Sequence, residues 1–297
     1  MGKVYWDEAE FKKANERLDV LALGDSWFWY PENNLLNSIN RFSNEPNILC
    51  FGANGATSVE LASGFYYASF ISALKGYTAV AAVLISAGGN DFAGFDDFQK
   101  ILKPDCSNAK KPSDCFDSVG LTNLINTVYQ SYERLIHATL AIRPSAKIHL
   151  HNYDYAIPTG KGFLGLGQWL KAPMDARRVP DPDDLAPGSF RRTLIKILID
   201  ELGVMQDSLV RDFIASVIRV RTPGILSDNE WANELHATPS GFNKLGKQCF
   251  SPVLGPIVLG PAPQKHPEQI MLASPSTKSR KKVSKKSGAK ARKEARI

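Results

Sequence analysis

A serine and a histidine that lie far apart in the sequence could together attack a carbonyl carbon. Ser26 follows an apolar run, and Gly24 lets the backbone bend sharply just before it. A serine hydroxyl becomes a nucleophile at neutral pH when a base takes its proton and nearby donors hold the developing oxyanion. His236 is the candidate base. The pair predicts nucleophilic catalysis through a covalent intermediate on Ser26.

Candidate donors for the oxyanion stand in three separate turns. Ser26 would begin a helix, where its own backbone N–H is free to donate. Gly55 has a backbone N–H that no side chain shields, and Asn90 carries a side-chain amide. Glycine and asparagine also suit turns with positive φ, and the two roles can coexist. We therefore predict an oxyanion hole formed by Ser26, Gly55 and Asn90.

The elements that must position these residues alternate between strands and helices. Short apolar runs predict five buried strands, which cover residues 18–23, 47–51, 77–86, 147–153 and 217–222. Near-continuous apolar strands are typical of a parallel sheet with helices on both faces. We therefore expect an α/β fold of three layers, α/β/α, with a short parallel sheet. The loops that carry the candidate residues would gather at the carboxyl edge of that sheet.

Four separated blocks resemble, in the right order, those of the SGNH/GDSL hydrolases. Gly24-Asp25-Ser26 is similar to the first block of that family, which holds the nucleophile, and Gly55 is similar to the glycine of the second block. Gly88-Gly89-Asn90-Asp91 resembles the third block, G-x-N-D, in which Asn90 supplies the oxyanion-hole amide. His236 is similar to the base of the last block. The resemblance covers roughly residues 17–255.

The resemblance implies a flavodoxin-like SGNH hydrolase fold and a carboxylic ester hydrolase that needs no metal or organic cofactor. Its substrate would be a small-molecule, lipid or carbohydrate ester. We expect a short-chain or acetyl ester first, because no long apolar lid is evident, and a phospholipid or other lipid ester second. The fold hosts many esterases and lipases, so the fold alone does not name the substrate.

One position departs from the family pattern. The family usually has an aspartate three residues before the histidine, and here that position is Asn233. An amide oxygen can accept the ring N–H of His236 and select its tautomer, but it cannot offset the imidazolium charge. A neighbouring carboxylate (Glu234, Glu230 or Asp228) could supply that charge; otherwise a Ser–His dyad operates.

Two other classes of function stay open at this stage. The asparagine at position 233 also fits a binding protein that keeps the scaffold with weakened catalysis. The second class is a polyanion-associated protein that acts through residues 278–297, which contain ten Lys or Arg and one acid and carry +9, whereas residues 1–277 carry −3. Such a segment suits nucleic acid, anionic phospholipid or lipopolysaccharide, and a solvated tail with no specific partner is the plain alternative.

Composition and the positions of proline, glycine and basic residues divide the chain into three parts. Hydrophobic residues make up 43% and charged residues 22%, which excludes a fibrous or wholly disordered chain. We expect an N-terminal extension at 1–16, a hydrolase domain at 17–255 with a long loop excursion at 154–189, and a Pro-rich, then basic, disordered tail at 256–297. No integral membrane segment and no export signal are evident, so we expect the cytoplasm, with signal-independent export as the alternative.

Several residues with reactive side chains have more ordinary interpretations. Cys106 and Cys115 flank a polar loop and could pair locally, although a cytoplasmic protein would keep them as thiols. His149 and His151 alternate on a predicted strand, but no third ligand has suitable spacing, so packed histidines are favoured over a metal pair. Residues 27–30 are all aromatic. We expect about half of them in the core and the rest in an acyl or sugar pocket.

Overall fold

The structure, a computed structural model, describes residues 2–31, 33–163 and 169–258. Within these residues six parallel strands form one sheet, in the order β1-β3-β2-β4-β5-β6. The strands are β1 (Val4–Tyr5), β2 (Val20–Gly24), β3 (Ile48–Gly52), β4 (Ala82–Ser86), β5 (Lys147–His151) and β6 (Val217–Val220). The predicted α/β class with a short parallel sheet is therefore confirmed.

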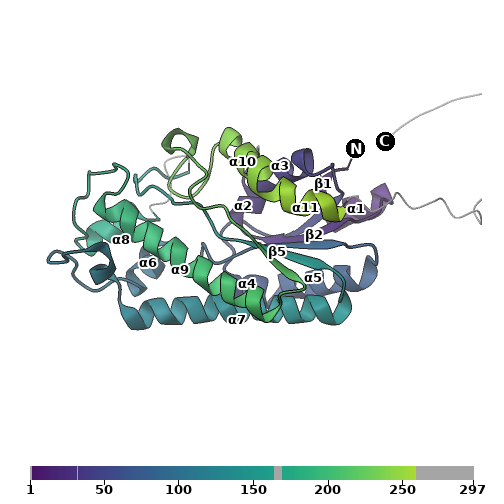
Figure 1. The fold of residues 1–297 in the computed structure, drawn as a ribbon, viewed down its shortest axis with the longest axis horizontal. Helices are drawn as coiled ribbons and strands as arrows, with labels where there is room; N and C mark the ends of the chain where they lie inside the picture. Colours follow the sequence, from purple (N-terminus) through teal and green to yellow (C-terminus); the bar gives the residue numbers. More distant parts are fainter. Residues whose placement is uncertain (1, 32, 164–168, 259–297) are drawn as a thin grey trace, which may run out of the picture. The chain divides into compact units, whose positions relative to one another are not determined.

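Helices cover both faces of this sheet, which gives three layers (Figure 1). Helices α3 and α11 pack on one face together with α10, and α5 and α9 lie on the other together with α7. The helices are α1 (Glu8–Ala14), α2 (Ser26–Trp29), α3 (Leu35–Phe42), α4 (Ser58–Leu61), α5 (Gly64–Gly76), α6 (Phe95–Lys100), α7 (Ser118–Ile142), α8 (Lys171–Ala176), α9 (Phe190–Asp212), α10 (Pro239–Leu245) and α11 (Ser251–Val258). Short 3₁₀ turns (Pro112–Cys115, Asp228–Glu230) and a π-turn (Gly246–Phe250) complete these elements.

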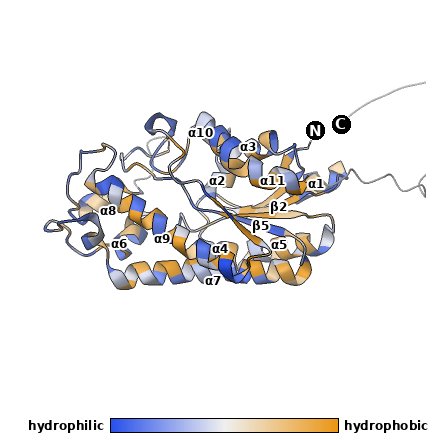
Figure 2. Cartoon of the chain, viewed as in Figure 1, coloured by the Kyte–Doolittle hydropathy of each residue, from blue (hydrophilic) through white to orange (hydrophobic). Residues whose placement is uncertain are grey.

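Apolar side chains hold the sheet between the two helical layers. In Figure 2 strand β2 is coloured hydrophobic, whereas the long helix α7 alternates between hydrophobic and hydrophilic residues along its length. The residues of β2 and β4 are all buried. Strands buried on both faces have no solvent side, which explains their near-continuous apolar sequence. The site loops at the ends of β2 and β4 therefore stand on a rigid base.

Local signals start the helices near the site. Asp25 caps α2, and its side chain accepts the backbone N–H of Trp27 at 3.1 Å. Thr57 caps α4 in a reciprocal capping box with Glu60. Thr238 caps α10, which begins at Pro239, a residue suited to the first helical position. Thr57 and Thr238 each follow a loop that carries a candidate site residue, whereas Asp25 directly precedes Ser26.

The chain termini differ from the sequence-based division. The segment at 1–16, expected to be an extension, supplies edge strand β1, which pairs with β3, and helix α1, whose Phe11 is buried. A two-residue strand is too short to produce a periodic signal, so the sequence could not reveal it. Helix α11 continues through Val258, past the expected start of the tail at 256. The basic segment 278–297 lies outside the described residues.

The described residues of the predicted excursion, 154–163 and 169–189, are mostly irregular and contain the short helix α8. Cys106 and Cys115, for which the sequence left local pairing open, are free and buried, and the Cys106 thiol lies 3.7 Å from the carbonyl oxygen of Cys115. Among the helices of the described residues, none has both the length and the apolar character needed to cross a bilayer.

Candidate active site

The predicted nucleophile stands at the first position of α2, directly after strand β2. Ser26 is 8% exposed, and its backbone N–H belongs to the first helical turn, where no carbonyl of the helix accepts it. Ser26 Oγ lies 2.8 Å from His236 Nε2, across 210 positions of sequence. The structure thus joins the two residues that the sequence paired as nucleophile and base.

The loop that carries His236 is tied to the nucleophile's helix. The indole N–H of Trp27 donates to the carbonyl of Leu235 at 2.9 Å, and an isolated bridge pairs Trp231 with Ala237 around the loop. His236 itself is 6% exposed. Because the loop is held at both its base and its tip, the imidazole is oriented by backbone contacts as well as by side chains.

Asn233 occupies the position where the family usually has an acid. Its Oδ1 lies 3.0 Å from His236 Nδ1 and also accepts the backbone N–H groups of Leu235 at 3.0 Å and His236 at 2.9 Å. Its Nδ2 donates to the hydroxyl of Tyr30 at 3.2 Å. Two backbone donors fix which end of the amide is the oxygen, so the ring nitrogen that faces it must carry the proton. His236 Nε2 is then left as an acceptor for the Ser26 hydroxyl.

The carboxylates that the sequence left as possible partners of the base have other partners. Glu230 bonds Lys244 at 2.8 Å, and Asp228 pairs with Arg192 at 2.7 Å. The fully buried Glu234 accepts backbone N–H groups at 2.8–3.0 Å from Gly160, Trp169, Leu170 and Lys171. Glu234 therefore joins the loop that carries His236 to the excursion at 154–189. Asn233 is the residue that contacts the imidazole ring of His236.

Burial sets the charge state of His236. Desolvation lowers the pKa of His236 to about 4, so the imidazole is neutral over most of the accessible pH range. The Tyr30 ring stacks on the imidazole, with centroids 4.2 Å apart and planes at 18°. An aromatic face at this distance attracts a cation, so Tyr30 favours the imidazolium that forms when the base takes a proton.

Asp25, another buried acid, stands directly before Ser26 in the chain. Asp25 accepts hydrogen bonds from Ser86 Oγ at 2.9 Å, from the backbone N–H of Trp27 and from the hydroxyl of Tyr153. Burial raises the pKa of Asp25 to about 6 in spite of these donors, which favour its charged form. This network holds the turn between β2 and α2 on which Ser26 stands.

The predicted oxyanion donors share one cavity with the base. Ser26, Gly55, Asn90 and His236 all line a cavity of about 310 Å³. Gly55 has φ +81°, a conformation that favours glycine, and the position of a side chain there is open space. Asn90 Nδ2 donates to the carbonyl of Ala56 at 3.1 Å, which leaves its second N–H for another acceptor.

Asp91 connects the two loops that carry these donors. Its carboxylate accepts the backbone N–H of Ser58 at 2.8 Å and the hydroxyl of Ser58 at 2.6 Å. Ser58 begins α4, just after Gly55 in the chain, and Asp91 follows Asn90. The contact therefore sets the spacing between the amide of Asn90 and the backbone N–H of Gly55.

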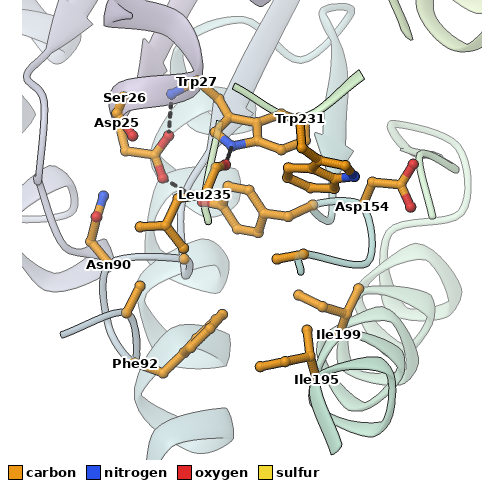
Figure 3. Close-up of a pocket in the computed structure, with 14 residues that line it drawn as sticks. Asp25, Ser26, Trp27, Asn90, Phe92, Asp154, Ile195, Ile199, Trp231 and Leu235 are labelled. Atoms are coloured by element: carbon orange, nitrogen blue, oxygen red, sulfur yellow. Dashed lines mark hydrogen bonds between the residues drawn. The ribbon is translucent and has the colours of Figure 1, made fainter. Parts of the chain in front are cut away.

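A second, smaller cavity of about 30 Å³ also reaches the nucleophile (Figure 3). Ser26, Asn90 and Leu235 line both cavities. The larger cavity has aromatic walls from Tyr30, Phe163 and Trp169. The smaller one is bounded mainly by carbon atoms.

The aromatic run and the paired histidines are placed as the sequence favoured. Trp27 and Phe28 are buried in the core, whereas Tyr30 lines the larger cavity. His149 and His151 are buried in β5, and His151 stacks on Trp27 with centroids 5.6 Å apart. In the described part of the chain, no cluster of His, Cys, Asp or Glu has the arrangement of a metal site.

Three contributions to the site were not found by sequence reasoning. Tyr30 was one of four adjacent aromatic residues with no signal to single it out. Glu234 was considered as a partner of the base, whereas its carboxylate binds backbone groups of the excursion. Trp169, 6.0 Å from the His236 ring between centroids, lies in a segment without periodicity. The sequence offered no signal for the link between Glu234 and the excursion.

Comparisons with known proteins show the fold. No family model matches the sequence, and no curated relative was found. Among solved structures, the lipase Lip_vut3 from a goat rumen metagenome is 13% identical with a TM-score of 0.51, covering 77% of this chain and 94% of the lipase. The extracellular lipase of Streptomyces rimosus is 18% identical with a TM-score of 0.47, covering 81% and 99%. A Slackia heliotrinireducens protein assigned to the SGNH hydrolases is 13% identical with a TM-score of 0.45, covering 78% and 96%.

These likenesses extend over most of both chains in each case. At 13% identity and a TM-score of 0.51, the likeness to the lipase Lip_vut3 shows a shared fold and leaves the chemistry to the residues themselves. The α/β fold that the SGNH/GDSL resemblance implied is thus confirmed.

Proposed function

We propose that this protein is a serine ester hydrolase in which Ser26 is the nucleophile and His236 the general base. The observation that carries the proposal is the hydrogen-bonded series from Ser26 Oγ to His236 Nε2 and from His236 Nδ1 to Asn233 Oδ1, at 2.8 and 3.0 Å. Nucleophile, base and orienting group stand in the order that acyl transfer requires. The lipase Lip_vut3, with a TM-score of 0.51, shares the fold that carries this series.

The reaction proceeds in two halves. Ser26 Oγ bonds to the ester carbonyl carbon while its proton passes to His236 Nε2, and the backbone N–H groups of Ser26 and Gly55 with the Asn90 amide hold the oxyanion. The carbon–oxygen bond to the alcohol then breaks, and His236 returns the proton to the leaving oxygen. Water repeats the sequence on the acyl-enzyme, which releases the acid and restores the Ser26 hydroxyl. None of these steps calls on a cofactor.

A short-chain or acetyl ester is the favoured substrate, and a lipid ester is second. The first test is hydrolysis of a p-nitrophenyl ester series, acetate to palmitate, by the native protein and by Ser26→Ala. We expect the substitution to lower kcat by ~10⁴-fold or more, since it removes the nucleophile. Asn123→Gln, an exposed change on α7, is the matched control. Hydrolysis by Ser26→Ala at the native rate would refute the role of Ser26 as nucleophile, and no hydrolysis by either protein would favour the binding-protein alternative.

For the basic segment 278–297 we propose contact with an anionic membrane surface. Its charge of +9 contrasts with the −3 of the remaining chain, and each basic residue near an anionic surface contributes about 1 kcal/mol of binding energy. Deletion of residues 270–297 should abolish salt-sensitive binding to vesicles that contain an anionic phospholipid. Unchanged vesicle binding after the deletion would refute this contact, and salt-sensitive binding to DNA alone would point to nucleic acid.

A further inference from the structure

Two cavities meet at the candidate nucleophile. Ser26 and Asn90 line both the cavity of about 310 Å³ and the cavity of about 30 Å³. An ester has two substituents on either side of the carbon that Ser26 would attack, the acyl chain and the alkoxy group. A site in which two cavities border the same candidate nucleophile and the same oxyanion donor can hold both substituents at once.

The position of the base decides which cavity holds which substituent. His236 lines the larger cavity, and the described residues around the smaller one do not include it. His236 must deliver a proton to the departing alkoxy oxygen, so the alcohol has to leave on the side where the imidazole lies. The acyl chain is then directed away from His236, into the smaller cavity.

The walls of the smaller cavity suit a hydrocarbon chain. In Figure 3, Asp25, Ser26 and Asn90 lie toward one end, and Phe92, Ile195 and Ile199 lie toward the other. The three apolar residues are at most 4% exposed. Ile195 and Ile199 come from α9, a helix of 23 residues that packs on β5 and β6, so the far wall is rigid. An apolar group that enters this cavity is removed from water against walls formed mainly by carbon atoms.

The size of the cavity limits the length of the chain. A cavity volume of about 30 Å³ corresponds to roughly two to three water-sized groups, since one water needs ~10–15 Å³. The larger cavity has about ten times this room, with aromatic faces from Tyr30, Phe163 and Trp169. We propose that the smaller cavity, closed by Phe92, Ile195 and Ile199, is the acyl-binding site of this enzyme and selects acyl chains of about two to four carbons on bulkier alcohols. This assignment rests on the ester hydrolase function proposed above.

The test compares chain-length preference in variants of the far wall. The native protein, Ile199→Ala and the milder Ile195→Val are assayed on p-nitrophenyl acetate, butyrate, hexanoate and octanoate. A pocket that is one methylene too small discriminates by roughly 10-fold or more, so the native kcat/KM should fall at least that much between butyrate and hexanoate. Ile199→Ala should raise the hexanoate-to-acetate ratio about 10-fold or more, and Ile195→Val should raise it less.

A matched control separates the pocket from general loosening of the core. Ile136 on α7 is buried to the same degree and does not belong to the lining of either cavity. Ile136→Ala should leave the hexanoate-to-acetate ratio unchanged, even if it lowers the melting temperature. An opposite change, Ala156→Leu, adds bulk inside the small cavity and should lower butyrate hydrolysis more than acetate hydrolysis.

Failure of this assignment can be told from failure of the proposed function. Reaction with an alkyl fluorophosphonate, followed by intact mass and peptide mapping, reports whether Ser26 is a nucleophile whatever the substrate preference. If Ser26 is labelled but the far-wall variants leave the acyl-length ratio at the native value, the acyl assignment is overturned. The same holds if those variants change selectivity among alcohols at constant acyl chain. If Ser26 is not labelled at all, the hydrolase proposal itself is wrong.

Discussion

Replacing Asn233 with aspartate should convert the base from a weak to a stronger one. In the native protein, Asn233 Oδ1 lies 3.0 Å from His236 Nδ1, and burial keeps the pKa of His236 at about 4. The backbone N–H groups of Leu235 and His236 would still bind the new carboxylate, so the geometry is retained. Asn233→Asp therefore changes charge at constant shape.

The size of the pKa shift follows from the distance between the new carboxylate and the imidazole ring of His236. A carboxylate and an imidazolium about 4 Å apart attract by about 4 kcal/mol at an effective dielectric constant of ~20. Desolvation of the new carboxylate reduces this, and an opposite charge so close usually shifts a pKa by about 1–3 units. The pKa of His236 should rise to between about 5 and 7 in the variant. If about half of that shift is expressed in the transition state, kcat/KM at pH 8 rises roughly 3- to 30-fold.

The sign of the pH dependence is equally specific. Neutral His236 is the active form, so the native kcat/KM should stay level from alkaline pH down to about pH 5 and fall near pH 4. In Asn233→Asp the fall should begin 1–3 units higher, because the carboxylate holds the proton on the ring. The native protein should therefore have the higher kcat/KM at acidic pH, and Asn233→Asp should have the higher kcat/KM at neutral pH.

The assay is kcat/KM on the butyrate ester between about pH 4 and pH 9, with product separated by chromatography so that detection is independent of pH. Asn123→Asp, exposed on α7, adds the same charge far from the base and should leave the profile unchanged. A native acid limb near pH 7, or one that Asn233→Asp fails to move, would refute the argument that Asn233 orients the ring without compensating its charge.

Three further predictions concern the surroundings of the base. Tyr30→Leu should lower kcat/KM about 2- to 30-fold, because a stacked aromatic face stabilises the imidazolium by about 0.5–2 kcal/mol. Tyr30→Phe keeps the ring and should keep most of the rate. Equal losses of kcat/KM in the two variants would exclude stacking as the cause. Glu234→Gln should lower the free energy of unfolding by about 2–4 kcal/mol, because the backbone N–H groups of residues 169–171 lose a charged acceptor. Hydrogen exchange of these N–H groups should be faster than in the native protein. Exchange at the native rate would contradict the role of Glu234 as their acceptor. Buried His151 has a pKa of about 4 in the folded protein and about 6.5 in the unfolded chain, so its contribution to the free energy of unfolding is complete above about pH 6.5 and is lost as pH falls toward 4. In urea unfolding, the stability of His151→Phe should therefore depend less on acid than that of the native protein. The control His137→Gln, at an exposed position, should show the same pH dependence of stability as the native protein.

Asp25 opposes the histidine effect over part of the same range. Its folded pKa of about 6 lies above its unfolded value, so its stabilising contribution is complete below about pH 4 and is lost as pH rises through 6. His149, His151 and His236 all have folded pKa values near 4 and act in the other direction. Burial also raises the pKa values of Asp91 and Asp154, so these two carboxyl groups act in the same direction as Asp25.

The sequence predicted the parts of the site that depend on local chemistry. The turn after β2 is visible in Gly24 and Ser26, and the positive φ at Gly55 is visible because glycine is favoured there. Each is a short-range signal at a strand end, and parallel strands bring such ends to one edge without further information. For this reason the fold class and the joining of Ser26 with His236 could be predicted without knowledge of any distance.

The missed parts depend on pairs of residues that no local pattern connects. The stacking of Tyr30 on His236 joins positions 206 apart, and Glu234 reaches donors more than 60 positions away. Strand β1 has two residues, which is too few for a periodic signal, yet its register with β3 brings the N-terminal segment into the domain. Contacts of this kind are determined by tertiary packing, and packing is decided by shape and volume rather than by residue type alone.

The environment of Asn233 separates two tasks that one aspartate usually performs. Selecting the tautomer needs an acceptor of known orientation, and two backbone N–H groups give the amide oxygen that orientation. Compensating the imidazolium needs negative charge or its equivalent, and in this site the nearest substitute is the face of Tyr30. A neutral partner leaves the pKa of the buried His236 low, so the base stays unprotonated in mildly acidic solution. The asparagine is thus consistent with a working hydrolase that gives up rate at neutral pH and keeps its activity toward acid.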